Sequence, residues 1–436
     1  MRVTGCRTGL RLAIVEAAVP PSGMNDADRL PVGPHVPSLT GRTVLLIAGA
    51  LLVVPLLVLI VKDRLPGPRL ARSAQRLVLV VAAQAGAVGL VFLLVNGQLA
   101  LYASWADLLG QQPAPVPGRH PTLAQQAVQR RVAQAKLAAP MDRAVKATPR
   151  RALDGVLVHT RLRGPVSDVQ TSMDLYLPPQ YFQPAYARVR FPVAELLVGH
   201  PGSPAAWTHR LRVDADLRAG VAAHTSIPFV LLMPNVNVAG RLDTACYDVV
   251  DGPAVDTLLG VDVPAVAKAT MRVRRDAAGW AVGGYSEGGY CGAYLAQRHP
   301  STFTAVLGLS GAYNSSKLAL GAPVIYGTDP RRKLEASPEW RITHLPGARL
   351  HYLLTASREE TDGTFASTVA FAAAVRAPST ADTIYLAHGG HNPRNWARIL
   401  PHALSWLSQL PGMDTGMPAS DRLTAVSQIP AWSRAS

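Results

Sequence analysis

A serine in a glycine-rich turn is the residue of this chain best placed to act as a nucleophile. Gly284-Tyr285-Ser286-Glu287-Gly288 matches the pattern G-x-S-x-G, with an apolar, strand-like run ending at Tyr285 and a helix-like stretch beginning at Glu287. A strand that turns sharply into a helix strains the serine backbone, needs small neighbours and places the hydroxyl at the helix N-terminus, where a developing anion is stabilised. Ser286 is therefore the candidate nucleophile, and the alternative is a glycine-rich turn with a bystander serine.

A serine nucleophile needs a base, and the segment H-G-G-H-N supplies two histidines just after the predicted last strand, 383–387. His388 directly abuts that strand. His391 sits further into a glycine-flanked loop that can turn back over the edge of the sheet. We therefore expect His391, rather than His388, to take the proton of Ser286.

The base needs a carboxylate to orient it, and three acids follow the predicted strand 350–356. They are Glu359, Glu360 and Asp362, in the segment S-R-E-E-T-D. Any of them gives the chain order serine, acid, histidine that is found in α/β-hydrolases. We favour Glu360 and then Asp362, and the choice among the three stays open.

Backbone N–H groups are expected to bind the oxyanion of such a site. One is that of Glu287, directly after the nucleophile, and the second comes from an earlier loop after a strand. The segment V-G-H-P-G at 198–202 follows a strand-like run. The N–H of His200 is the expected donor because Pro201 has none, and we interpret the His200 side chain as pocket lining.

Short apolar runs alternate with helix-like stretches between residues 153 and 410, which predicts an α/β domain with a mostly parallel sheet. The expected strands are 169–177, 193–198, 228–233, 280–285, 305–310, 350–356 and 383–387, and the expected helices are 253–273, 287–298, 364–375 and 393–408.

Two uncharged apolar runs precede this domain, at 43–61 and 77–95. Nineteen residues of helix rise about 28 Å, close to the hydrocarbon thickness of a bilayer of roughly 30 Å, so both are predicted to be transmembrane helices. A buried core hairpin and a cleavable signal peptide are the less favoured alternatives. Residues 1–42 are expected to be disordered, and either Met1 or Met24 is the start.

The net charge of +15 suggests nucleic-acid binding, but its distribution argues against it. Residues 1–152 carry +12, whereas residues 153–410 carry only +3. The loop 62–76 holds five basic residues and one acid, which places it in the cytoplasm by the positive-inside rule. The domain is then extracytoplasmic at a cell membrane crossed twice.

Two further segments are assigned by composition. Residues 106–152 are predicted to be a Pro-rich, basic linker, either lying along anionic lipid or wall polymer or forming a solvated tether. Residues 411–436 are predicted to be a flexible tail.

Several segments resemble the esterase D / antigen 85 branch of the α/β-hydrolase superfamily, especially membrane-tethered esterases of actinobacterial type. The likeness covers roughly residues 155–410. The segments that carry it are M-D-L-Y-L-P-P-Q-Y-F (173–182), L-L-V-G-H-P-G-S-P-A-A-W (196–207), D-T-A-C-Y-D (243–248), G-Y-S-E-G-G-Y-C-G-A-Y-L-A-Q-R-H-P-S-T-F (284–303), L-S-G-A-Y (309–313) and G-G-H-N-P-R-N-W (389–396).

The resemblance implies an α/β-hydrolase fold and serine hydrolysis or acyl transfer without metal or organic cofactor. Cys246 and Cys291 fall in two of the matching segments and would form a disulfide in an extracytoplasmic domain; the alternative is two buried thiols. Glu287 departs from the family, where small or polar residues are commoner, and a carboxylate beside the oxyanion would weaken catalysis unless the side chain turns away.

The sequence therefore predicts a membrane-anchored extracytoplasmic serine esterase that acts on a small-molecule or lipid ester. Two alternatives stay open. One is an acyltransferase, similar to a mycolyltransferase, that transfers the acyl group to a cell-envelope sugar. The other is a catalytically inert envelope-binding module on a hydrolase fold.

Overall fold

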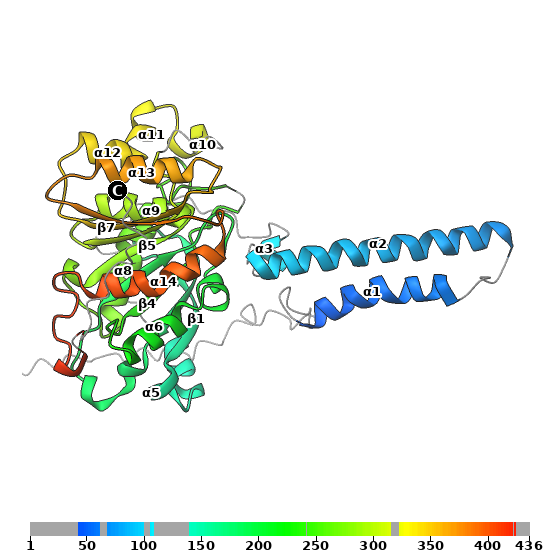
Figure 1. The fold of residues 1–436 in the computed structure, drawn as a ribbon, viewed down its shortest axis with the longest axis horizontal. Helices are drawn as coiled ribbons and strands as arrows, with labels where there is room; N and C mark the ends of the chain where they lie inside the picture. The colour runs from blue at the N-terminus through cyan, green and yellow to red at the C-terminus, as the bar shows by residue number, and fades with distance from the viewer. Residues whose placement is uncertain are drawn as a thin grey trace, which may run out of the picture.

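The computed structural model consists of a helical hairpin that projects from an α/β domain (Figure 1). The residues described are 42–61, 68–99, 105–108, 139–240, 242–314, 322–421 and 423. Apart from Arg42, the predicted disordered segment 1–42 lies outside them, as do Met24 and the first half of the loop 62–76.

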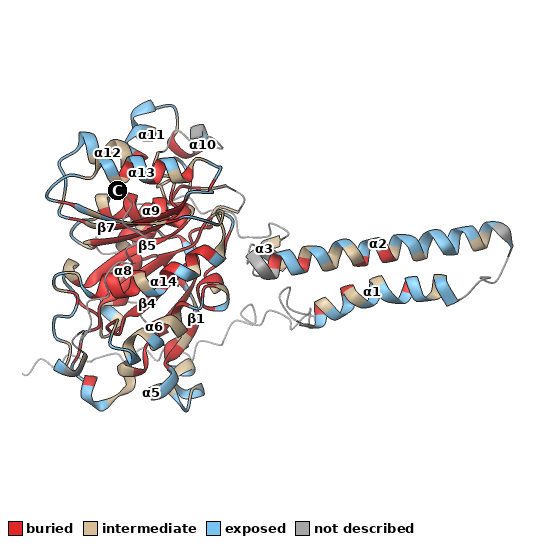
Figure 2. Cartoon of the chain, viewed as in Figure 1, coloured by how far each residue is buried: buried red, intermediate tan, exposed pale blue. Residues whose placement is uncertain are grey.

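The hairpin is formed by α1 (Arg42–Val61) and α2 (Arg69–Leu99). Within them, Thr43–Val61 and Leu70–Asn96 have mean hydropathies of 3.2 and 2.6 and are long enough to cross a bilayer. The helices pack closely at Gly86, where an added Cβ would meet the backbone of Leu52. Their outer faces expose leucine and valine along most of their length (Figure 2). Helix α2 is longer than the predicted run and includes three basic residues of the loop 62–76, Arg69, Arg72 and Arg76.

The domain is built on an eight-stranded sheet with the order β1-β2-β4-β3-β5-β6-β7-β8. Strand β2 runs antiparallel to both neighbours, and all the other pairings are parallel. The strands are β1 (Val156–Arg163), β2 (Gln170–Leu177), β3 (Val193–Leu197), β4 (Val230–Pro234), β5 (Trp280–Tyr285), β6 (Ala305–Leu309), β7 (His351–Ser357) and β8 (Thr380–Leu386). The predicted mostly parallel sheet is thus confirmed, and β1 is a strand that the sequence analysis did not predict.

Helices cover both faces of the sheet. Helices α6 and α14 pack together on one face, and α9, α12 and α13 cover the other (Figure 1). The helices are α3 (Trp105–Leu108), α5 (Arg151–Asp154), α6 (Val213–Ala222), α7 (Val255–Thr257), α8 (Val263–Thr270), α9 (Glu287–Arg298), α10 (Ala322–Tyr326), α11 (Pro330–Ala336), α12 (Pro338–His344), α13 (Thr364–Ala374) and α14 (Pro393–Ser408). Short 3-10 or π turns are η2 (Pro179–Phe182), η3 (Pro184–Tyr186), η4 (Ala206–Arg210), η5 (Leu258–Asp262), η6 (Ala277–Gly279) and η8 (Ala419–Asp421).

The ordered domain extends beyond the predicted limits of 153 and 410. Residues 139–147 are helical, and Met141 is buried in the domain core, so the end of the predicted linker packs on the domain. Met413 is fully buried, and the Arg274 guanidinium donates to the carbonyl of Gly412 at 2.8 Å. The first part of the predicted tail is therefore folded, because it covers apolar surface that the sheet and its helices leave open. Residues 109–138 and 424–436 lie outside the described residues.

Candidate active site

Ser286 stands in a strained turn at the carboxyl end of β5. Its φ and ψ are 58° and −123°, and its N–H donates to the carbonyl of Leu309 at 2.8 Å. Helix α9 begins at the next residue and packs so closely on β3 that a Cβ at Gly288 would overlap the carbonyl of Leu197. The glycines of the motif are therefore needed for this close approach, as the pattern predicts.

His391 reaches the serine from the loop between β8 and α14. Its Nε2 lies 2.8 Å from Ser286 Oγ, a hydrogen bond through which the imidazole can take the hydroxyl proton. Asn395 donates from its side chain to the carbonyl of Gly390 at 2.7 Å, which fixes the loop against α14. His388 instead contacts Glu359 at 2.9 Å on the exposed surface.

Two of the three acids face the other nitrogen of the histidine. Glu360 Oε2 lies 3.6 Å and Asp362 Oδ2 lies 3.5 Å from His391 Nδ1. Both separations are long for a hydrogen bond, and such contacts are often loose until substrate is bound. The Glu360 side chain is fully buried, whereas that of Asp362 is 50% exposed. Glu359 is the acid that the structure places elsewhere, against His388.

A hydrogen-bonded network fixes Glu360. Its Oε1 accepts from the Ser310 hydroxyl at 2.7 Å and from the Ser357 N–H at 3.1 Å. The indole N–H of Trp396 donates to Ser310 at 3.0 Å. Among the described residues, Glu360 Oε2 and His391 Nδ1 are buried atoms with no hydrogen-bond partner. The network thus aims a free carboxylate oxygen at the imidazole.

Asp362 is held differently. Its Oδ1 accepts from the N–H of Thr364 at 2.9 Å at the start of α13. Partial burial raises the pKa of Asp362, but the hydrogen bonds from Thr364 and the nearby charge of His391 outweigh it, so that the pKa is lowered. Atoms of Glu360, Asp362 and His391 also lie within 4.8 Å of one another, a spacing that would suit a metal ion. The contact of His391 with Ser286 favours proton transfer as the use of this group.

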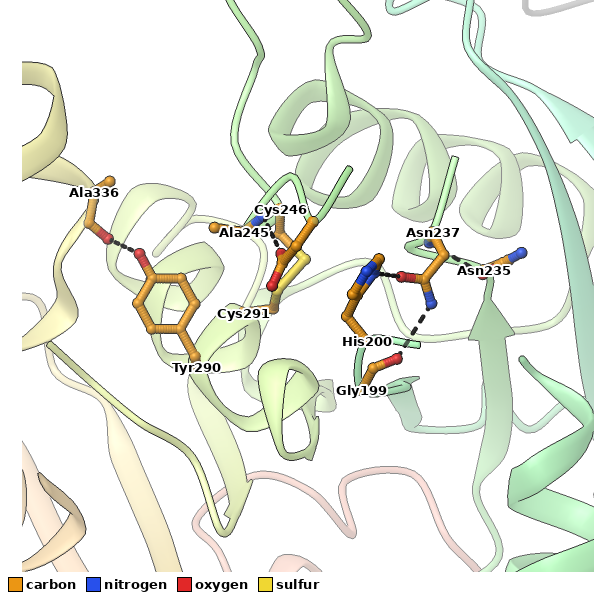
Figure 3. The surroundings of a disulfide bond; sticks show 10 residues. Gly199, His200, Asn235, Asn237, Ala245, Cys246, Tyr290, Cys291 and Ala336 are labelled. Carbon is orange, nitrogen blue, oxygen red and sulfur yellow. Dashed lines mark hydrogen bonds between the residues drawn. A yellow bond between two sulfur atoms is a disulfide. The ribbon is translucent and has the colours of Figure 1, made fainter. Parts of the chain in front are cut away.

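The predicted oxyanion loop lies directly against the nucleophile. A Cβ added to Gly199 would be 3.0 Å from the Cβ of Ser286. The Asn237 side-chain amide donates to the carbonyls of Gly199 and Gly202 at 3.2 and 2.9 Å, and its oxygen lies 2.5 Å from His200 Nδ1 (Figure 3). Asn237 therefore anchors the loop and holds the His200 side chain. It was missed by the sequence analysis, because it follows β4 rather than any motif.

Comparison with known proteins agrees with this architecture. Residues 168–409 match the model of the family described as "Putative esterase". The chain belongs to this esterase family.

Two solved structures are similar to the esterase over about 60% of its length. An S-formylglutathione hydrolase from Agrobacterium tumefaciens is 14% identical, with a TM-score of 0.50 over 60% of this chain and 97% of that one. A ferulic acid esterase is 18% identical, with a TM-score of 0.49 over 59% and 98% of the two chains. No curated protein matches the sequence. At 14% identity, the likeness to the S-formylglutathione hydrolase shows an α/β-hydrolase fold.

The esterase buries the side chain of Glu287 beside its nucleophile. Burial, together with the charge of Asp243 and a hydrogen bond to it, raises the pKa of Glu287 well above its usual range. Glu287 Oε2 is buried without a partner among the described residues. The raised pKa therefore favours the protonated, neutral form of Glu287, which reduces the negative charge beside the oxyanion position.

Cys246 and Cys291 are joined by a disulfide (Figure 3). It connects the segment 243–248 to α9, the helix that begins at the nucleophile. The same segment carries Asp243, whose Oδ1 accepts from the Ala245 N–H at 2.8 Å. The disulfide thus helps to hold the Asp243 carboxylate near Glu287.

Proposed function

We propose that the chain is a serine esterase that cleaves carboxylic esters through an acyl-enzyme. His391 takes the proton of Ser286 as Oγ attacks the ester carbonyl, and returns it to the leaving alcohol. Water, deprotonated by His391, then releases the acid and regenerates the serine. The observation that carries this proposal is the 2.8 Å contact between His391 Nε2 and Ser286 Oγ at a strained strand–helix turn.

Glu360 is proposed as the acid that orients His391, with Asp362 as a secondary contact. Burial and fixation by Ser310 and the Ser357 N–H support this choice, because an orienting group must have a fixed position. The N–H groups of Glu287 and His200 are proposed as the oxyanion hole. The start of α9 and the close approach of Gly199 to Ser286 support that assignment.

Anchoring in a cell membrane by α1 and α2 is also proposed, with the domain on the extracytoplasmic side. The apolar, exposed faces of the hairpin support the anchor. The basic residues of the loop 62–76 support the orientation. A cysteine introduced at exposed Ser301 should react with a membrane-impermeant maleimide in intact cells. No reaction in intact cells, with full reaction after lysis, would contradict this orientation.

Labelling with a fluorophosphonate tests the catalytic proposal. We expect stoichiometric labelling of the full-length chain in detergent, its loss in Ser286→Ala, and its retention in Ser301→Ala, which changes an exposed serine remote from the site. A folded chain that is not labelled, or a Ser286→Ala variant that labels equally, would overturn the proposal.

A further inference from the structure

The end of the second membrane helix meets the domain beside the nucleophile. Helix α2 contacts η4, the short helix that follows the loop carrying Gly199 and His200. In η4, the Trp207 side chain is fully buried, and its ring centroid is 5.2 Å from that of Tyr285. Tyr285 directly precedes Ser286. One short helix thus lies between the end of α2 and the nucleophile turn.

The apolar part of α2 ends at this same place. Its membrane-compatible stretch finishes at Asn96, whose polar side chain is buried within the described structure. Helix α2 itself ends at Leu99, so only one turn separates the end of the apolar stretch from the end of the helix. A bilayer that covers the apolar stretch therefore has its polar surface at the level of η4.

The catalytic edge of the sheet faces this surface. Loop 199–205 and η4 follow the carboxyl end of β3, at the same edge of the sheet where Ser286 follows β5. Figure 1 shows the helical hairpin projecting from the domain, with α3 at its domain-side end. His209 and Arg212, in and just after η4, are exposed there, as basic groups next to anionic headgroups would be.

We propose that the substrate is a lipid carboxylic ester drawn from the same membrane that anchors the enzyme. The inference rests on the proposed esterase function and adds the substrate class. Lipid ester carbonyls lie at the boundary between headgroups and hydrocarbon. Helix α2 ends at this depth and holds the catalytic edge of the domain there. The acyl chain remains in the bilayer while its carbonyl reaches Ser286, so the enzyme need not extract a lipid into water.

The test uses the full-length chain in vesicles of ether-linked phospholipids, which contain no carboxylic ester. The probes are 4-methylumbelliferyl palmitate carried in the enzyme's own vesicles, the same ester carried in separate vesicles, and soluble 4-methylumbelliferyl acetate. We expect the palmitate rate to follow its mole fraction in the enzyme's own membrane. We also expect it to be at least tenfold higher than with separate vesicles. Equal rates for the two palmitate supplies would overturn the inference.

Two outcomes separate this inference from the proposed function. Hydrolysis of the acetate without hydrolysis of palmitate in the same membrane overturns the membrane-substrate inference alone. A chain inert toward both esters and toward fluorophosphonate overturns the esterase proposal, and the inference with it. Ser286→Ala supplies the blank rate for all three probes.

A pair of charge reversals tests the orientation. Arg212→Glu changes the edge proposed to face the bilayer, and Arg190→Glu changes an exposed residue at the opposite end of β3. In vesicles containing anionic ether lipid, Arg212→Glu should lower the palmitate rate at least fivefold, since the loss of one cation near such a surface already costs about 1 kcal/mol and the new anion is repelled as well. Acetate hydrolysis should be unchanged in both variants. Equal palmitate rates for the two variants would overturn the placement of the catalytic edge.

Discussion

The loop after β7 and the middle of β3 both bury a glutamate completely, but only the first provides hydrogen-bond donors. Glu360 accepts from Ser310 and from the Ser357 N–H and turns its other oxygen to His391. Glu195 has no hydrogen-bond partner for either oxygen within the described structure, and burial raises its pKa well above the usual range. The difference is therefore between a buried carboxyl that the fold supplies with hydrogen-bond donors and one that has none within the described structure.

Glu287 lies between these two cases. It is buried, as both others are, but the group that faces it is another carboxyl, Asp243. A buried acid next to an acid keeps its proton, and a buried acid among donors is suited to interact with a cation. The four predictions below test this distinction.

The largest effect is expected at Glu360, the buried carboxyl with hydrogen-bond donors. Glu360→Gln should lower kcat on a soluble ester by roughly 10³–10⁴-fold, as loss of the orienting acid does in other triads. Asp362→Asn, which is isosteric in the same way, should cost less than about tenfold because water screens its half-exposed charge. The measurement is kcat for both variants at pH 7. A larger loss of kcat in Asp362→Asn than in Glu360→Gln would mean that Asp362, and not Glu360, orients His391.

Removing the donor that holds Glu360 should have the next effect. Ser310→Ala deletes the hydroxyl between Trp396 and Glu360 Oε1 and should reduce kcat roughly 10–100-fold, with KM little changed. Thr368→Ser, which retains a buried hydroxyl that donates to the carbonyl of Gly311, is the matched control. Unchanged kcat in Ser310→Ala would show that burial alone positions the acid.

Glu195, the buried carboxyl without hydrogen-bond donors, should affect stability rather than the catalytic rate. The pKa of Glu195 is higher in the folded chain than in the unfolded chain, so the folded chain holds the proton more tightly. Stability therefore falls as the pH rises from about 4.3, the ordinary pKa of glutamate, to the raised pKa of Glu195 in the folded chain. Glu195→Met should raise the free energy of unfolding at pH 7 by about 1–3 kcal/mol. Denaturant unfolding at pH 5 and pH 8 measures this. Glu195→Gln should lose the same pH dependence, and a retained slope would contradict the assignment.

The smallest effect is expected at Glu287, and only above the raised pKa of its carboxyl group. Below its raised pKa the group is neutral, so Glu287→Gln should change kcat less than about twofold at pH 7. Above that pKa the wild type gains a negative charge beside the oxyanion and should become roughly three- to tenfold slower than the variant. Asp243→Asn should move the wild-type decline to lower pH, because Asp243 helps to raise the pKa. Superimposable pH–rate profiles of wild type and Glu287→Gln would refute the argument.

Much of the fold could be predicted from local patterns. The helices 287–298 and 393–408 and the strand 280–285 have the predicted limits, because apolar runs and helical spacing of apolar residues are signals within a few residues. Strand β1 was missed since it lies at the edge of the sheet and reads V-L-V-H-T-R-L-R, with polar residues on its exposed side. The folded segments at 139–147 and 411–421 depend on contacts with distant parts of the chain.

The site likewise combines features with a local sequence signal and features that depend on distant contacts. Chain order and loop position were enough to predict that Ser286 and His391 would meet, and the structure brings them together. The choice between Glu359 and Glu360, adjacent in sequence, depends on which side chain points inward. Ser310 lies in the segment L-S-G-A-Y (309–313), but its hydrogen bond joins it to Glu360, 50 residues further along the chain, and such a contact leaves no local signal in the sequence. The roles of all these residues stay predictions until the variants are measured.

The disulfide gives the esterase a tolerance to cleavage. Cys246 and Cys291 are 45 residues apart, and the span between them includes β5 and the nucleophile. A protease that cuts this span once leaves two fragments that remain covalently joined. On a gel such a nicked chain migrates as one band until a reductant is added. The disulfide therefore keeps together the two fragments of a nicked chain that would separate without it.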